Sequence, residues 1–367
     1  MVVERLVLKH FRNYTNLELS PAPGVNIITG HNGSGKTNMI EALSLLSELR
    51  SFRGVGDGAL MQWDADSYFC RADIVGPDER RFEVGCALYD GRARKRYKID
   101  DAEIRGSAEY YGRFVSVILS PGDLALVDGP PEARRRYVDA VIAKIDRGYL
   151  RDLVSFRKVL ASRNRILKDA RGEARAPGDQ LSVWNALFAE LTVAIVARRT
   201  EFARTFAPVI QDAYGRIADD SLAPALSYAP STGEAGKQDI VERLEGCLRR
   251  DLQMGSTTIG PQRDEFVLHD RRGERFADSA SQGQKRTAAI ALKIAELDFV
   301  ERALGKRAVI LIDDIFPELD AQRRAAALEL FRRENQTFVT MARDGLGGDG
   351  MNGAARFRVE DGRVSAL

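Results

Sequence analysis

Cysteine and histidine are scarce in this 367-residue chain, and neither type is clustered. The cysteines stand singly at Cys70, Cys86 and Cys247. Because no C-x-x-C pair occurs, a disulfide framework and a structural zinc site are both disfavoured, which suits a reducing cytoplasm. The histidines are equally dispersed, at His10, His31 and His269. We therefore expect ordinary surface or packing residues here, and no metal cluster.

Long apolar segments and a large excess of one charge are also missing. No uninterrupted apolar run reaches 18 residues, and the first residues, MVVERLVLKHF, lack the long apolar core of a signal peptide. The net charge of +2 does not by itself demand a polyanionic partner. With 44% hydrophobic residues and length for two or three domains, we expect a soluble cytoplasmic protein without membrane contact.

The segment GHNGSGKTN, residues 30 to 38, matches the phosphate-binding pattern G-x-x-x-x-G-K-[ST]. The matched loop comprises Gly30, His31, Asn32, Gly33, Ser34, Gly35, Lys36 and Thr37. The run VNIIT (25 to 29) before it predicts a buried strand, and helical spacing after it predicts a helix from Lys36 to about Leu49. This context disfavours the alternative of a glycine-rich surface turn.

This phosphate-binding loop (P-loop) predicts a nucleotide site in which each residue type has a distinct role. Its glycines let backbone N–H groups face inward, and the helix N-terminus adds positive partial charge. Lys36 supplies a charge for the outer phosphates, while the Thr37 hydroxyl is a candidate ligand for Mg²⁺.

A second element of the same site is predicted in AVILIDD, residues 308 to 314. This reads as a buried strand that delivers two carboxylates at its C-terminal end, where ligands of open α/β sheets bind. We expect Asp313 to hold Mg²⁺ and Asp314 to position and deprotonate the attacking water. Taken alone, the two acids could equally begin an ordinary loop.

The segment SQGQ, residues 281 to 284, opens a predicted helix and offers a second anion site. Most P-loop enzymes need only one such helix end. We therefore expect Ser281, Gln282 and Gly283 to close over a nucleotide held by another copy of the chain. The alternative is an ordinary helix cap provided by Ser281.

The elements alternate along the chain in a way that predicts three segments. Residues 1–125 and 255–367 are expected to form an α/β ATPase head with a split, mixed sheet. Residues 126–254 are expected to form an inserted helical arm, because two long helical patterns flank the breaker-rich segment ARGEARAPGD (170 to 179). Helices joined by such a short connection should pack as an antiparallel hairpin.

Together, GHNGSGKT, SQGQ, VILIDD and ELD (318 to 320) resemble the ATP-binding-cassette (ABC-type) head shared with SMC proteins. The segments SPGDLALVDGPPEARRRYVD and GPQRDEFVL resemble the RecF family of bacterial recombination mediators more specifically, and this likeness runs over nearly the whole chain. The resemblance implies ATP-driven homodimerisation, DNA binding in recombinational repair, replication restart and the SOS response, and co-operation with RecO and RecR in placing recombinase on gapped DNA. It also implies a nucleoid-associated location.

The resemblance also assigns further residues. Arg12, Asn13 and Arg53 become candidates for nucleotide contact, and the loop 318–320 is expected to cross the dimer seam. Cassette transporters commonly carry Glu where Asp314 stands, and a His near Thr340. Their absence here favours slow hydrolysis, typical of a switch rather than a motor.

A basic surface is expected on the arm. Residues 132 to 175 contain 13 Lys/Arg and 6 Asp/Glu, a net charge of +7 in a chain whose total is +2. The candidates for binding double-stranded DNA and gapped or single-stranded junctions are Arg134, Arg135, Arg136, Arg163, Arg165 and Lys168. A merely solvated helical face is the alternative.

Three other functions remain to be weighed. A structural DNA clamp of SMC type would need hundreds of coiled-coil residues, yet Lys36 and Asp313 are only 277 positions apart. A small-molecule kinase would need neither SQGQ nor the arm. A binding module with an inactive nucleotide site is disfavoured because the P-loop lysine and both acids are present.

Overall fold

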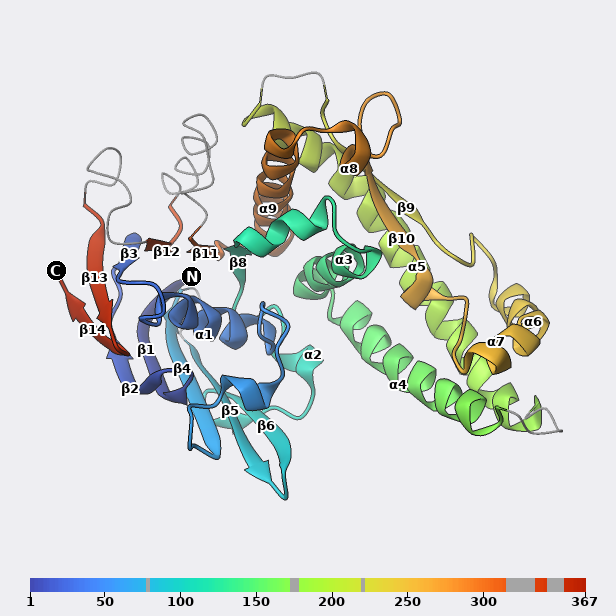
Figure 1. Cartoon of the computed structure of the whole chain (residues 1–367), viewed down its shortest axis with the longest axis horizontal. Coiled ribbons are helices and arrows are strands. Elements are labelled where there is room, and N and C mark those ends of the chain that lie inside the picture. Colours follow the sequence, from blue (N-terminus) through green and yellow to red (C-terminus); the bar gives the residue numbers. More distant parts are fainter. Residues whose placement is uncertain (77–79, 172–177, 219–221, 315–333, 342–352) are drawn as a thin grey trace. The chain divides into compact units, whose positions relative to one another are not determined.

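The computed structural model describes residues 1–76, 80–171, 178–218, 222–314, 334–341 and 353–367 (Figure 1). The chain divides into two compact units. The first, here called the head, comprises Met1–Leu124, Asp212–Asp220 and Arg286–Leu367. The second, called the arm, comprises Ala125–Gln211 and Ser221–Lys285. An inserted helical lobe therefore separates the two halves of an α/β head.

One sheet of the head is antiparallel and has the order β2-β1-β4-β5-β6-β7. Its strands are β1 (Val2–Phe11), β2 (Tyr14–Leu19), β4 (Ser67–Val75), β5 (Arg80–Tyr89), β6 (Arg92–Ile99) and β7 (Ala102–Glu103). Burial alternates along β4 and β5, as in a sheet with one face on the core and one in water. Polar and charged side chains can therefore occupy the outer face.

The other head sheet has the order β14-β13-β3-β12-β11-β8, and only the β13–β14 pair is antiparallel. Its strands are β3 (Val25–Thr29), β8 (Ser116–Leu119), β11 (Val309–Asp313), β12 (Thr337–Met341), β13 (Ala355–Glu360) and β14 (Arg363–Ala366). The strand predicted over 25–29 is confirmed as β3. Every residue of β11 and β12 is buried, as expected for parallel strands covered on both faces.

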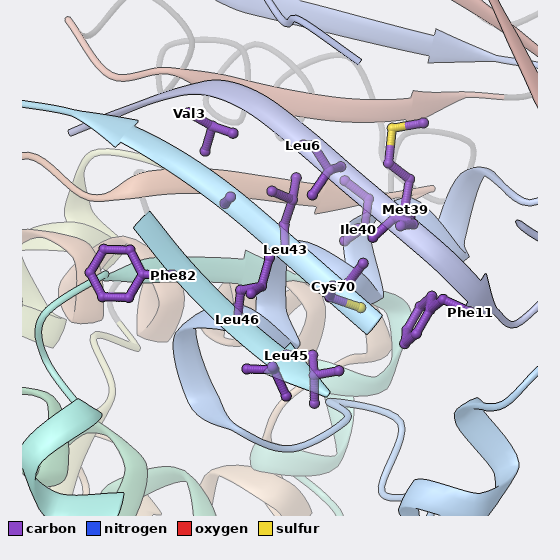
Figure 2. Packing of buried hydrophobic residues seen from close by; sticks show 14 of the residues in the cluster. Val3, Leu6, Phe11, Met39, Ile40, Leu43, Leu45, Leu46, Cys70 and Phe82 are labelled. Carbon is purple, nitrogen blue, oxygen red and sulfur yellow. The ribbon is translucent and has the colours of Figure 1, made fainter. Parts of the chain in front are cut away.

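Helix α1 (Lys36–Glu48) packs against strands of both sheets. Its side chains Met39, Ile40, Leu43 and Leu46 are fully buried. Figure 2 shows them beside side chains such as Leu6 from the antiparallel sheet. The predicted helix from Lys36 is confirmed, and its packing anchors the P-loop to the main core of the head.

In the described part of the head, the remaining helical elements are short or connect to the arm. They are η1 (Asp57–Leu60), α2 (Ser107–Tyr110), η2 (Pro121–Leu126) and α9 (Gln282–Leu304). Helix α9 starts in the arm and continues into the head, so it joins the two units covalently.

The arm consists mainly of three helices and a two-stranded sheet. Its elements are α3 (Pro131–Ile145), α4 (Arg147–Asp169), α5 (Gly178–Gly215), β9 (Ala225–Ala229), α6 (Lys237–Gly246), α7 (Leu248–Met254), η3 (Pro261–Arg263), β10 (Glu265–His269) and α8 (Phe276–Ser279). An 18-residue window of α5 is apolar and long enough to cross a membrane, but core helices of soluble proteins pass the same test.

The contacts between α4 and α5 confirm the predicted antiparallel hairpin. Asp152 accepts a hydrogen bond from Arg198 at 2.9 Å, and the rings of Phe156 and Phe188 lie 5.1 Å apart. Farther along α4, Arg163 donates to Asn185 at 2.9 Å. As the residue number rises in α4 it falls in α5, which is the pattern of antiparallel neighbours.

The second boundary between head and arm lies later than the sequence predicts. We expected the head to resume at 255, but the arm extends to Lys285. The reason is strand pairing, since β10 pairs antiparallel with β9 over Glu265–His269. Conversely, the end of α5 from Asp212 belongs to the head.

A buried arginine, Arg199, ties α5 to the rest of the arm. Its side chain is 2% exposed and forms ion pairs with Asp139 at 2.8 Å and Asp264 at 3.0 Å. It also donates to the carbonyl of Pro261 at 2.8 Å. One guanidinium therefore connects α3, α5 and the segment before β10.

We expect Arg199→Met to destabilise the arm by about 3–5 kcal/mol, because it removes the cation from buried Asp264 and leaves Asp139 with only the more distant Arg157 at 3.9 Å. The neighbouring Arg198→Met is the matched control, since Arg198 pairs with Asp146 and Asp152 at the surface. Its loss should cost about 0–1 kcal/mol. Urea denaturation followed by circular dichroism measures both, and equal effects would contradict the central role of Arg199.

Candidate nucleotide site

The P-loop has the backbone that its glycines predict. Gly35, which precedes α1, has φ of 118°, a region that favours glycine. At Gly30 a Cβ atom would lie 2.4 Å from the carbonyl oxygen of Val359, so a larger residue does not fit. The buried Lys36 folds back over the loop, and its Nζ donates to the carbonyls of Gly30 and His31 at 2.9 Å each.

Three residues outside the loop hold it in place. Asn13 Nδ2 donates to the carbonyl of Ser34 at 2.7 Å, and the Tyr14 hydroxyl donates to the carbonyl of Gly35 at 2.9 Å. From the β13–β14 turn, the N–H of Gly362 donates to the carbonyl of Ser34 at 3.3 Å. Asn13, a predicted nucleotide contact, therefore supports the loop backbone. Tyr14 and Gly362 carry no signal in the sequence that would have singled them out.

The acid at the end of β11 meets the P-loop helix directly. Thr37 Oγ1 and Thr340 Oγ1 both donate to Asp313 Oδ1 at 2.8 Å. Burial raises the pKa of Asp313, while the two hydroxyl bonds oppose that rise. Burial also lowers the pKa of Lys36, and the charges of Asp314 and Asp313 oppose that fall. The structure thus brings the predicted lysine, hydroxyl and carboxylates into one polar cluster.

Asp314 has an unusual conformation beside this cluster. Its φ is 46°, and its N–H donates to Thr340 Oγ1 at 3.0 Å. Its Oδ1 is buried and receives no hydrogen bond from the described residues. Positive φ is uncommon for residues other than glycine and is concentrated at functional sites. Asp314 is therefore held in place through its backbone, and none of the described residues donates to its Oδ1.

A buried glutamate that the sequence analysis missed organises the rest of the cluster. Glu41 on α1 is 0% exposed and accepts two hydrogen bonds from Arg12, each 2.9 Å long. Arg53 approaches the same carboxylate at 3.8 Å, and Ser51 Oγ donates to it. The available signal was a charged residue within the apolar pattern of α1. Two predicted nucleotide contacts, Arg12 and Arg53, are thus positioned by one carboxylate.

The SQGQ segment lies at the start of α9, within the arm unit. Ser281 N–H donates to Gln284 Oε1 at 2.8 Å, and Gln284 N–H donates back to Ser281 Oγ at 3.3 Å. This reciprocal pair is a capping box, so Ser281 acts as the ordinary helix cap that was the alternative to an anion site. Gln282 remains exposed. The loop 318–320, expected at a dimer seam, lies outside the described residues.

A family model described as the RecF/RecN/SMC N-terminal domain matches residues 2–362. The DNA replication and repair protein RecF of Listeria welshimeri is 31% identical over 371 residues, with 99% of both chains covered. The chain belongs to the RecF family. The RecF of Halalkalibacterium halodurans is 32% identical over 374 residues, again covering 99% of both chains.

Solved structures agree with this family assignment. A structure of the recombination mediator protein RecF-ATPrS in the RecFOR pathway matches with a TM-score of 0.89 and 31% identity, covering 100% of this chain and 98% of that one. An SMC head bound to the C-terminal winged-helix domain of ScpA matches with a TM-score of 0.52 and 17% identity. The latter shows a shared head fold alone. The expected fold, an SMC-like ATPase head with a helical insertion, is therefore confirmed.

Two of the arginines predicted for DNA binding in this RecF-family chain are buried, so those predictions are corrected. Arg163 is 0% exposed and pairs with Asp251 at 2.8 Å. Arg134 is 7% exposed and donates to the carbonyls of Phe266 and Gly129. Arg135 is half-buried and donates to the carbonyl of Asp264 at 2.7 Å. Charge counting could not separate these structural arginines from solvent-facing ones.

The other candidates are exposed, and α4 adds more basic residues to them. Arg136, Arg165 and Lys168 are exposed, although Arg136 pairs with Glu132 at 3.4 Å. Arg151, Lys158 and Arg165 are exposed at seven-residue intervals on one side of α4. Within the described part of the chain, none of these three has an ion partner. They form a basic stripe about 21 Å long at 1.5 Å per residue.

We expect Gly362→Ala to weaken ATP binding through the P-loop. Gly362 has φ of 75°, and its added Cβ would lie 2.4 Å from the carbonyl of Asn13, pushing Asn13 away from Ser34. Gly91→Ala is the matched control, because Gly91 has φ of 71° but open space around it. Both variants should lose about 1 kcal/mol of stability from the unfavourable φ. Only Gly362→Ala should lower ATP affinity in calorimetry, and equal affinities would contradict the support role.

Proposed function

We propose that this chain is an ATP-dependent, DNA-binding recombination mediator that dimerises on ATP and helps to load recombinase at gapped DNA. The observation that carries the proposal is the hydrogen bond from Thr37 of the P-loop to Asp313 at the end of β11. It joins the two halves of a nucleotide site that the sequence separates by 277 positions between Lys36 and Asp313. Family membership adds the names of relatives: DNA replication and repair protein, and recombination mediator.

The donor set fits Mg²⁺–ATP. No group of three or more His, Cys, Asp or Glu side chains that could hold a metal occurs among the described residues. Mg²⁺, however, is commonly held by one or two carboxylates with substrate phosphates and waters. Thr37 and Asp313 would hold the ion, which would neutralise charge on the phosphates. The loop N–H groups and Lys36 would bind the phosphates themselves.

Asp314 is proposed as the residue that orients and deprotonates the attacking water. Its buried Oδ1, which lacks a partner among the described residues, supports this role. An aspartate reaches less far than the glutamate common in cassette transporters. We therefore propose slow hydrolysis that resets a dimer rather than driving continuous motion.

Dimerisation is proposed through Ser281, Gln282 and Gly283, which would approach the nucleotide of a second copy. The position of this segment at the N-terminus of the long helix α9 supports the proposal, because the helix end favours an anion. RecR and RecO are proposed as protein partners because a solved relative is described as a recombination mediator of the RecFOR pathway. An SMC-type structural clamp is the weaker alternative, because the α4–α5 hairpin is far shorter than a long coiled coil.

Three variants test the ATP switch. Asp314→Asn should bind ATP, lose hydrolysis by about a hundredfold or more, and stay dimeric in ATP. Ser281→Arg should bind ATP as a monomer because its bulk would block the seam. Lys36→Met should lose tight ATP binding altogether. Sedimentation with and without ATP measures the states, and identical behaviour of Asp314→Asn and Ser281→Arg would refute the two-site model.

We propose that duplex DNA lies along the basic stripe of α4, formed by Arg151, Lys158 and Arg165. Exposed cations on one side of a helix can each contact a phosphate without reading the base sequence. Two arms in one ATP-bound dimer would double this charge along a single duplex. The stripe replaces the predicted cluster around Arg163, whose guanidinium is already used inside the arm.

Changing Arg151, Lys158 and Arg165 together to Glu should weaken duplex binding. The slope of log K against log salt should flatten by about 2.7, since each phosphate contact contributes about 0.9. ATP binding should stay normal because all three residues lie outside the P-loop cluster. Fluorescence anisotropy across a salt series provides the measurement. Unchanged affinity and salt slope in this variant would show that duplex DNA does not bind along α4.

A further inference from the structure

A second basic surface lies on the head, on the hairpin formed by β5 and β6. Residues 88 to 98, LYDGRARKRYK, contain five Lys/Arg and one Asp. The strand register places Arg92, Arg94 and Arg96 opposite Tyr89, Ala87 and Gly85. All three arginines are exposed, whereas Lys95 between them is less so and pairs inward with Asp57. Alternation thus sends the arginines to the outer face of the antiparallel sheet.

The other half of this outer face is electrically balanced. Asp73 pairs with both Arg71 and Arg81, and Glu18 pairs with Arg5 at 2.6 Å. On the hairpin the balance is missing. Arg92 and Lys98 have no ion partner among the described residues, and Arg96 has only Glu103 at 3.9 Å. The unpaired cations therefore concentrate on β6.

Two exposed aromatic rings stand at the same end of this sheet. Trp63 is 93% exposed and Tyr89 is 52% exposed, both unusual for such large rings. Trp63 belongs to the connection before β4, and that connection accepts a hydrogen bond at Asp66 from Leu88, the neighbour of Tyr89. The Arg94 guanidinium lies 5.4 Å from the centre of the Tyr89 ring. Tyr89 therefore lies among the arginines of β6, and Trp63 is in the connection that is hydrogen-bonded to this end of β5.

We propose that this hairpin face, with Trp63, Tyr89 and the three arginines of β6, binds single-stranded nucleic acid. The arginines match the spaced phosphates of a strand, and the rings offer stacking partners to unpaired bases. Paired bases in a duplex are stacked on each other and cannot reach such rings. Because it presupposes work on DNA, this inference rests on the function proposed above.

The arginines and Trp63 are suitable test positions because the fold does not depend on them. Their side chains point to solvent, and the inward residues of β6, such as Ile99, make the core contacts. The chain has two tryptophans, so Trp184→Phe leaves Trp63 as the only indole reporter. In this background, oligo(dT) of about 20 nucleotides should quench the emission of Trp63, and rising salt should reverse the quenching.

Changing Arg92, Arg94 and Arg96 together to Glu should weaken oligo(dT) binding at least tenfold. It should also lower the salt slope by about 2, since each phosphate of a single strand contributes about 0.7. Trp63→Ala, followed with a labelled oligonucleotide, should weaken binding about five- to hundredfold, the contribution of one stacked base. The control makes the same charge change elsewhere, with Glu at 204, 237 and 275, where exposed cations pair with Glu201, Glu190 and Glu265; it should keep oligo(dT) binding.

Unchanged Trp63 emission at saturating oligo(dT), or unchanged binding by the β6 variant, would overturn the proposal. Equal quenching by polyglutamate would also overturn it, because an acidic protein surface would then be the occupant. Failure of ATP-driven dimerisation together with intact Trp63 quenching would refute the switch model and support the strand site. The reverse pattern would retain the switch and remove the strand site.

Discussion

The head depends on one buried contact, in which Asp313 accepts hydrogen bonds from Thr37 and Thr340. The carboxylate ends β11, Thr37 opens α1, and Thr340 lies in the neighbouring strand β12. Because parallel strands present their carboxyl ends at one edge of a sheet, these three positions meet although the entire arm separates Thr37 from the other two in sequence. A nucleotide bound here would contact groups from both halves of the split head, so binding would be linked to the way the halves are joined.

Glu41 makes a second connection of the same kind, between α1 and the turn that carries Arg12. A buried carboxylate is expensive to desolvate unless its oxygens are paired, and Glu41 satisfies this condition with Arg12 and Ser51. Asn13, next to Arg12, then supports the P-loop backbone at Ser34. The position of the loop is therefore fixed by polar contacts that originate in the antiparallel sheet, while apolar packing of α1 supplies the bulk of the stabilisation.

The elements that sequence patterns predicted well were those whose signal is local. The strand before the P-loop, the helix after it, and the acid-terminated strand β11 each follow from burial periodicity and punctuation by glycine. The predictions that failed depend on contacts between residues far apart in the sequence. Arg163 is matched with Asp251, 88 positions away, and no local pattern distinguishes it from exposed Arg165. Residues 255–285 belong to the arm because β10 pairs with β9. The order of elements along the sequence had placed this segment in the head. Glu41 escaped notice because its partners come from two separate segments, at Arg12 and at Ser51 to Arg53.

The burial and partners of each arginine identify DNA-binding candidates better than the density of charge along the sequence does. Arg134, Arg163 and Arg199 are buried and donate to carbonyls or carboxylates inside the arm, so a phosphate could reach them only by breaking buried contacts. Among the described residues, Arg151 and Arg165 of α4 and the outward arginines of β6 lack strong ion partners, and neutralising them with phosphate would release counterions without disturbing the fold. Their settings also differ. The α4 stripe is made of cations alone, which suits the regular backbone of a duplex. The β6 row is accompanied by exposed rings, which can stack on unpaired bases but not on bases that are already stacked in a duplex. If both surfaces act in one molecule, the strand type bound at each would follow from whether aromatic side chains accompany the arginines.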